Sequence, residues 1–89
     1  MNIKHDLKIL PQYMEATLAG RKTFELRKND RDFQVGDTFI LREWENGAYT
    51  GRHFIQAISY VLKDCPEYGL ADGYCIFGWR KAVQNERTD

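Results

Sequence analysis

Three charged side chains at short spacing, Lys22, Glu25 and Arg27, form the densest polar pattern in this 89-residue sequence. A desolvated lysine can act as a nucleophile or a base, and a carboxylate can transfer protons. The same groups can also bind a ligand, because arginine presents a planar fork to phosphate oxygens and lysine a mobile point charge. A third interpretation, favoured by composition alone, is a set of surface ion pairs worth about 0–1 kcal/mol each.

The element expected to position these groups is a strand over residues 23–27. Polar and apolar side chains alternate along it, which is the period of a half-buried strand. Phe24 and Leu26 are then predicted to face the core. The polar residues, Glu25 and Arg27 among them, would share the other face, about 6.6–7 Å apart along the chain. A carboxylate and a guanidinium on one rigid strand would line a small polar site.

The rest of the chain predicts a mainly β domain (α+β) with one or two short helices. Further strand patterns lie at residues 3–10, 37–45, 49–63 (with a break at Gly51) and 74–79. Pro11 fits the first turn of a helix that ends at Gly20, and Asn46-Gly47 predicts a hairpin. The core is predicted to centre on Phe24, Leu26, Phe39, Leu41, Ile58 and Ile76. This pattern favours a small barrel-like fold and leaves an open α+β sheet as the alternative.

Length and composition indicate a single folded domain over residues 1–80, with a polar tail at 81–89 expected to be disordered. Thirteen Lys and Arg balance thirteen Asp and Glu, so the formal net charge is zero. Strong long-range attraction to nucleic acid is therefore not expected. The segment from Arg21 to Arg31 is locally basic, because it holds five basic and two acidic side chains.

The location expected for this chain is the cytoplasm. The sequence has neither a recognisable secretory leader nor a run of about 18 apolar residues that would cross a membrane. Cys65 and Cys75 are therefore expected to be reduced thiols. The spacing of the cysteines and histidines matches no zinc site, and a Gly-rich phosphate loop is absent. We expect no membrane association, no metal and no cofactor.

The spacing Gly-x-Lys-x-x-Glu-x-Arg, here at Gly20, Lys22, Glu25 and Arg27, resembles the signature of the ASCH domains of the PUA-like superfamily. Other segments resemble the small DUF3850 family of bacteria and phages. These segments are residues 5–11, 27–33, 35–37, 41–43, 49–52 and 58–62. The resemblance implies a PUA-like pseudobarrel, in which a curved mixed sheet is plugged on one side by the helix. It also implies a cleft beside the strand that carries the signature.

The resemblance further implies that this cleft recognises RNA or a modified nucleotide. Lys8, Lys22 and Arg27 would meet phosphate or carbonyl oxygens, and Glu25 would accept a hydrogen bond from a base or orient the basic groups. The other candidate binding residues are His5, Lys28, Arg31 and Tyr60. Trp44 is a further candidate for stacking on a base at the cleft.

Two other functions stay open. The first is a small amidohydrolase acting on a modified nucleoside, with Lys22 and Glu25 as the catalytic candidates. One branch of the ASCH group hydrolyses the amide of acetylated cytidine, but it has a threonine where this chain has Glu25. A carboxylate there favours the charged form of a neighbouring amine, so binding is expected over catalysis. The second is a protein-interaction module of phage or bacterial origin, which a large exposed apolar patch would support.

Overall fold

The computed structural model describes residues 2–81, which form six strands, one α-helix and one 3-10 helix. The strands are β1 (His5–Ile9), β2 (Phe24–Lys28), β3 (Thr38–Glu45), β4 (Ala48–Ala57), β5 (Tyr60–Lys63) and β6 (Tyr74–Gly78). The helices are α1 (Pro11–Leu18) and η1 (Pro66–Tyr68). The tail predicted at residues 81–89 lies, apart from Lys81, outside the described residues.

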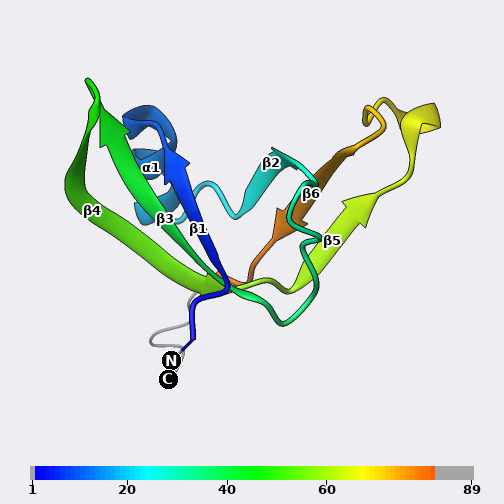
Figure 1. The fold of residues 1–89 in the computed structure, drawn as a ribbon, viewed down its shortest axis with the longest axis horizontal. Helices are drawn as coiled ribbons and strands as arrows, with labels where there is room; N and C mark the ends of the chain where they lie inside the picture. Colours follow the sequence, from blue (N-terminus) through cyan, green and yellow to red (C-terminus); the bar gives the residue numbers. More distant parts are fainter. Residues whose placement is uncertain (1, 82–89) are drawn as a thin grey trace.

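Two three-stranded sheets, β1-β3-β4 and β2-β6-β5, make up the fold. They diverge from a common base like the arms of a V (Figure 1). The mainly β class with short helices is therefore confirmed. Within residues 2–81 the two sheets stay separate and do not close into a barrel.

The first sheet combines a parallel and an antiparallel pair. β1 runs parallel to β3, and β3 runs antiparallel to β4. The turn between β3 and β4 is at Asn46 and Gly47, both with positive φ (52° and 83°), so the predicted hairpin is confirmed. β4 continues through Gly51, and the predicted break there is wrong. The chain changes sheet between β4 and β5, so the prediction of one strand running on to Lys63 is wrong. At this point the Ile58 N–H donates to the Asp37 carbonyl and the Ser59 N–H donates to the Gly78 carbonyl.

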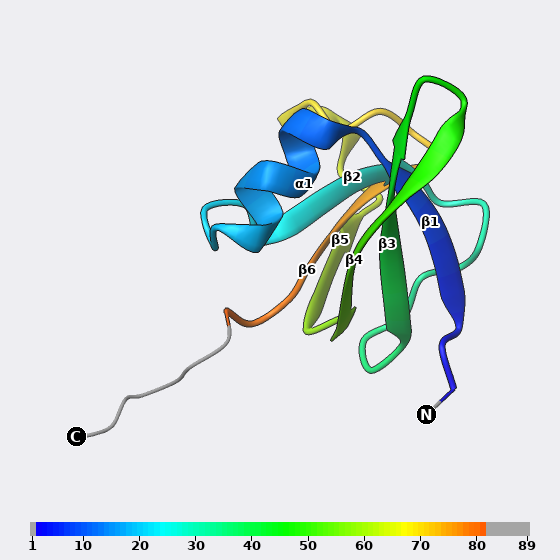
Figure 2. The same cartoon turned by 90° about the vertical axis from the view of Figure 1, so that its left-hand side faces the viewer.

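Helix α1 covers one part of this first sheet. It begins at Pro11 without a side-chain cap and ends before Gly20, whose φ of 80° and N–H bond to the Thr17 carbonyl close the last turn. Met14 and Thr17 are buried, and the helix packs on β3 and β4 (Figure 2). Packing on the sheet therefore compensates for the missing cap.

The core lies where the two sheets meet. Phe39, Leu41 and Ile58 are at most 2% exposed, as predicted. Aromatic rings join the sheets, because the centroid of Phe77 on β6 lies 5.1 Å from that of Phe39 on β3 and 4.9 Å from that of Phe33. These contacts hold the base of the V together.

The side chains of β2 have the opposite orientation to the predicted one. Phe24 and Leu26 are 49% and 58% exposed, whereas Glu25 is only 6% exposed. Ile76, which pairs with Leu26, is half-buried on that outer side, while Phe77 fills the core. Alternation gives the period of a strand but does not say which face is inside. Glu25 can take the inner face because its carboxylate has a cationic partner on each side.

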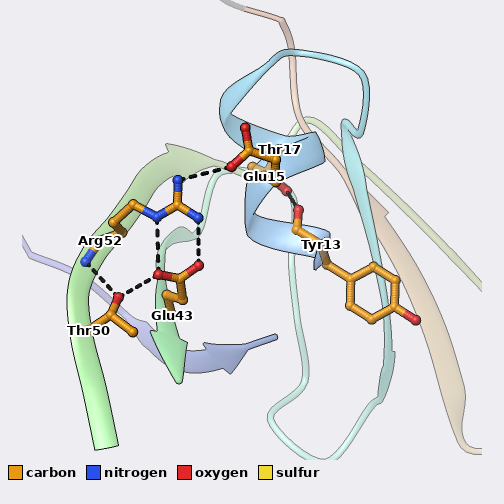
Figure 3. A network of polar contacts seen from close by, with 6 residues as sticks. All are labelled: Tyr13, Glu15, Thr17, Glu43, Thr50 and Arg52. Carbon is orange, nitrogen blue, oxygen red and sulfur yellow. Dashed lines mark hydrogen bonds and ion pairs between the residues drawn. The ribbon is translucent and has the colours of Figure 1, made fainter. Parts of the chain in front are cut away.

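A polar network centred on the buried Glu43 fastens α1 to the first sheet (Figure 3). Glu43 accepts hydrogen bonds from Arg52 at 2.7 and 3.0 Å and from the Thr50 hydroxyl at 2.5 Å. Arg52 also reaches Glu15 on α1 at 3.2 Å. The hydrogen bonds from Arg52 and then Thr50 lower the pKa of Glu43, and Glu43 in turn raises the pKa of Arg52. The Tyr13 ring points away from this network (Figure 3).

Candidate functional site

A cleft of about 810 Å³ lies between the end of β1, the start of α1 and β2. Its walls are formed by Lys8, Ile9, Leu10, Tyr13, Arg21, Lys22, Phe24, Glu25, Leu26, Arg27, Lys28 and Tyr74. β1 and β2 are edge strands of their sheets, so the cleft separates two sheet edges. Lys22, Glu25 and Arg27 therefore lie in one concave site.

Glu25 is the centre of the polar group in this cleft. Its two carboxylate oxygens accept from different cations: Oε1 from the Lys22 ammonium and Oε2 from Nε of Arg27 at 2.8 Å. The side chains of Lys22, Glu25 and Arg27 are 14%, 8% and 26% exposed. A buried carboxylate is tolerated only when it is paired, so the three side chains hold each other in place.

Arg27 also ties the two edges of the cleft together. Its Nη2 donates to the carbonyl of Lys8 on β1 at 2.5 Å. Lys8 borders the cleft, but its Nζ lies 3.9 Å from the centroid of the Trp44 ring. Lys8 thus contributes its backbone carbonyl to the cleft wall, and its ammonium makes a cation–π contact with Trp44. Lys28, another predicted binding residue, is exposed in the cleft wall.

The cleft is electropositive in a chain without net charge. Apart from Lys8, whose ammonium lies against Trp44, four of its lining residues are Lys or Arg and one is Glu. Clefts lined mainly by one sign of charge concentrate ligands of the opposite sign. The arrangement is therefore suited to an anionic or carbonyl-rich ligand.

Aromatic side chains border the same cleft. Tyr13, Phe24 and Tyr74 are 48%, 49% and 40% exposed. Tyr74 lies directly across from Lys28 in the β2–β6 pair. Phe24 was predicted to lie in the core, which is wrong, and no site role was predicted for Tyr13 or Tyr74. The available signal was the proximity of Tyr13 and Phe24 to the basic segment, because exposed aromatic residues beside basic ones provide stacking surfaces for bases.

His5, a predicted binding residue, lies in the core and not in the cleft wall. It is 3% exposed, its Nε2 is 2.8 Å from Oδ2 of Asp37, and its ring centroid is 4.5 Å from that of Phe33. Burial raises the pKa of Asp37, but the hydrogen bonds with His5 and the Gln34 N–H give a net lowering. His5 thus connects β1 to the turn before β3.

Arg31 and Tyr60 also lie away from the cleft wall. Nη1 of Arg31 donates to the carbonyl of Asp6 at 3.2 Å and so ties its loop to β1. Tyr60 is 64% exposed on β5, which β6 separates from β2. The cleft therefore brings together five of the eight predicted binding residues: Lys8, Lys22, Glu25, Arg27 and Lys28.

The cysteines and the acidic side chains of the described residues offer no further reactive or metal site. Cys65 and Cys75 are buried and unpaired with each other, and burial raises the pKa of the Cys75 thiol, which disfavours a reactive thiolate. Residues 2–81 bring no three His, Cys, Asp or Glu side chains together in a way that would hold a metal ion. In the same residues, no helix has the length and apolar character needed to span a membrane.

Together, the fold and the cleft define a small two-sheet β domain with a polar, electropositive site at a sheet edge. Residues 4–79 match the family described as "Domain of unknown function (DUF3850)", and the chain belongs to this family. It is also similar to the "Uncharacterized 12.9 kDa protein in GpA 3'region" of Escherichia phage P2, with 46% identity over 48 residues. That match covers 54% of this chain and 44% of the phage protein, so the chain matches less than half of its relative's length.

Proposed function

We propose that this domain binds RNA or a modified nucleotide in the cleft along β2, and that it is an ASCH-like member of the PUA-like superfamily. The observation that carries the proposal is the grouping of Lys22, Glu25 and Arg27 in one cleft with exposed aromatic side chains. The superfamily assignment rests on the signature that these residues share with Gly20 and on the helix packed against one of two diverging sheets.

The cations of the cleft keep donors available for a ligand. An ammonium group has three N–H donors, and Lys22 uses one of them on Glu25. A guanidinium has five, and Arg27 uses Nε on Glu25 and Nη2 on Lys8. The remaining donors would bind phosphate or carbonyl oxygens, and Glu25 would fix the direction in which they point. Tyr13, at the cleft wall, would stack on a base.

The same geometry supports binding over amide hydrolysis. A nucleophilic lysine must be neutral, and a neutral Lys22 would give up its ion pair with Glu25. Glu25 would then lie buried with one cationic partner fewer. Recognition of the ligand keeps both ion pairs intact, so it is the function that this cleft supports best.

A binding and turnover experiment tests the proposal. Labelled single-stranded RNA and acetylated cytidine are titrated against the wild type, Arg27→Ala and Lys63→Ala, with thermal unfolding of each. Arg27→Ala should weaken binding at least about tenfold, because it removes a charge-assisted donor worth roughly 1.5–3 kcal/mol. Lys63→Ala, an exposed position on β5 outside the cleft, should bind like the wild type. If both variants lose the same amount of affinity, the ligand does not bind in the cleft. If the wild type hydrolyses acetylated cytidine, the function is hydrolysis and not binding.

A further inference from the structure

The outer face of the second sheet is apolar along all three of its strands. In the register of β2, β6 and β5, Leu26 pairs with Ile76 and Ile76 with Leu62, while Phe24 and Tyr60 both pair with Gly78. The residues of this outer apolar face are Phe24, Leu26, Tyr60, Leu62, Tyr74 and Ile76. An antiparallel sheet with one face in water ordinarily carries polar residues there. This sheet carries apolar side chains on both faces.

The exposure of these side chains is large. Phe24, Tyr60 and Tyr74 are 49%, 64% and 40% exposed, and Leu26 and Leu62 are 58% and 39% exposed. Helix α1 packs on β3 and β4 of the other sheet, so it does not provide the missing layer (Figure 1). Large apolar patches on a small domain mark a surface that binds another molecule.

The chemistry of the face points to a protein partner. Lys28, paired with Tyr74 at one end, is the charged residue that the register places on this face. Single-stranded nucleic acid needs a basic groove beside its stacking surface, and an anionic membrane needs several cations around an apolar patch. Lys22, Arg27 and Lys28 adjoin this face along β2 only, whereas Tyr60 and Leu62 on β5 offer apolar contact area with no cation of the cleft beside them.

The size and charge of the face fit a second copy of the chain. At about 200 Å² for a fully exposed aromatic ring, its three aromatic residues present roughly 300 Å², and the aliphatic side chains raise this to roughly 500 Å². A standard interface buries about 800 Å² per partner, of which about 60% is apolar. A formal net charge of zero means that two copies do not repel each other at long range.

We infer that the outer apolar face binds the same face of a second copy, in a two-fold symmetric dimer of stacked sheets. The two β2-β6-β5 sheets would lie about 10 Å apart, as in a β-sandwich. Such a contact is isologous, so both copies use the same residues of the face to bind each other. Phe24, Leu26 and Tyr74 also border the cleft, and the partner would therefore stand at its rim. The inference does not depend on the ligand of the cleft.

Sedimentation of the full chain over roughly a hundredfold range of concentration tests the inference. The wild type should pass from monomer to dimer, and Leu62→Asp should raise the dissociation constant at least about tenfold, since it places a charge in an apolar contact. Val35→Asp is the matched control, because Val35 is 63% exposed in the loop between β2 and β3. It should dimerise like the wild type. Circular dichroism at the lowest concentration confirms that each variant is folded.

Three results would overturn the inference. The first is a wild type that is monomeric at every concentration, and the second is a dimer that Leu62→Asp and Val35→Asp affect equally. If Leu62→Asp does not fold, Tyr60→Ser takes its place, because Tyr60 is 64% exposed and its loss removes little from the core. A dimer that Tyr60→Ser leaves unchanged is the third result against the inference.

Discussion

At the scale of single residues, a buried carboxylate organises the candidate site. Glu25 is 6% exposed and holds both Lys22 and Arg27 in the cleft wall. The sequence indicated that these three residues belong together, because Glu25 and Arg27 share one face of the predicted strand and Lys22 lies at its entry. It gave no sign that Glu25 is buried, since burial depends on the cations that reach it. Removing one of those cations should therefore affect folding as well as binding.

A double-mutant cycle at Lys22 and Glu25 measures this coupling. Lys22→Met leaves a buried carboxylate with one partner fewer and should lower the free energy of unfolding by about 1–3 kcal/mol. Adding Glu25→Gln removes the unpaired charge, so the double variant should be more stable than the sum of the two single effects predicts. Urea unfolding gives the four free energies. If the stability losses of the two single variants simply add, the Lys22–Glu25 ion pair contributes no more than two separate exposed side chains would.

The carboxylate of Glu43 makes a prediction about acid stability. Its pKa lies below its ordinary value of 4.5, first because Arg52 and then because Thr50 donate to it. A carboxyl group whose pKa falls on folding stabilises the protein at pH values above its pKa in the unfolded chain. This contribution is lost as the pH falls through the pKa of the group in the folded protein. The urea midpoint should therefore fall as the pH drops below 4.5.

Glu43→Gln separates this contribution from general acid effects. The variant should be less stable than the wild type at neutral pH and should lose less stability on acidification below pH 4.5. Glu45→Gln is the control, because Glu45 is exposed two residues further along β3. If stability falls as steeply with acid in Glu43→Gln as in the wild type, other groups cause the acid sensitivity, and Asp37 is the first candidate.

At the scale of elements, local signals predicted turns well and sheet faces less well. Asn46-Gly47 specified its hairpin because these residues accept positive φ regardless of what packs around them. The orientation of β2 was predicted in reverse. The neighbouring strand β6 has an apolar residue on each face, Ile76 on one and Phe77 on the other, so the sequence did not show which face is buried. The change of sheet at Ile58 also had no sequence signal, because residues 54–63 are largely apolar throughout. Both features are decided by tertiary contacts.

Two leucine truncations test the corrected faces. Leu41 is fully buried, so Leu41→Ala should lower the free energy of unfolding by about 2–5 kcal/mol. Leu26 is 58% exposed, and Leu26→Ala should cost no more than about 0.5 kcal/mol. Denaturant unfolding at low protein concentration, where self-association is minimal, gives both values. Similar losses in the two variants would restore the predicted inward orientation of β2.

At the scale of the whole molecule, the distribution of charge matters more than its sum. The chain is formally neutral, yet its cleft is lined by four cationic residues besides Lys8 and by one carboxylate, and the outer face of the second sheet is almost uncharged. Composition alone excluded a strongly basic nucleic-acid binder. It could not reveal that the fold places a largely charged cleft beside a largely apolar face, with Phe24, Leu26 and Tyr74 bordering both. This arrangement depends on the way α1 and the two sheets are joined.

The charge distribution predicts how RNA binding responds to salt. A neutral chain supplies little attraction beyond the cleft, so phosphate contacts are limited to a few side chains such as Lys22, Arg27 and Lys28. Each phosphate contacted on a single strand contributes about −0.7 to the slope of log K against log salt, so three contacts give a slope of roughly −2. Titration of labelled single-stranded RNA at several salt concentrations measures this slope. Lys28→Ala should reduce its magnitude by about 0.7, whereas Lys63→Ala should leave it unchanged. A slope several times steeper would require a larger basic surface than the cleft presents, and it would place the RNA outside the cleft.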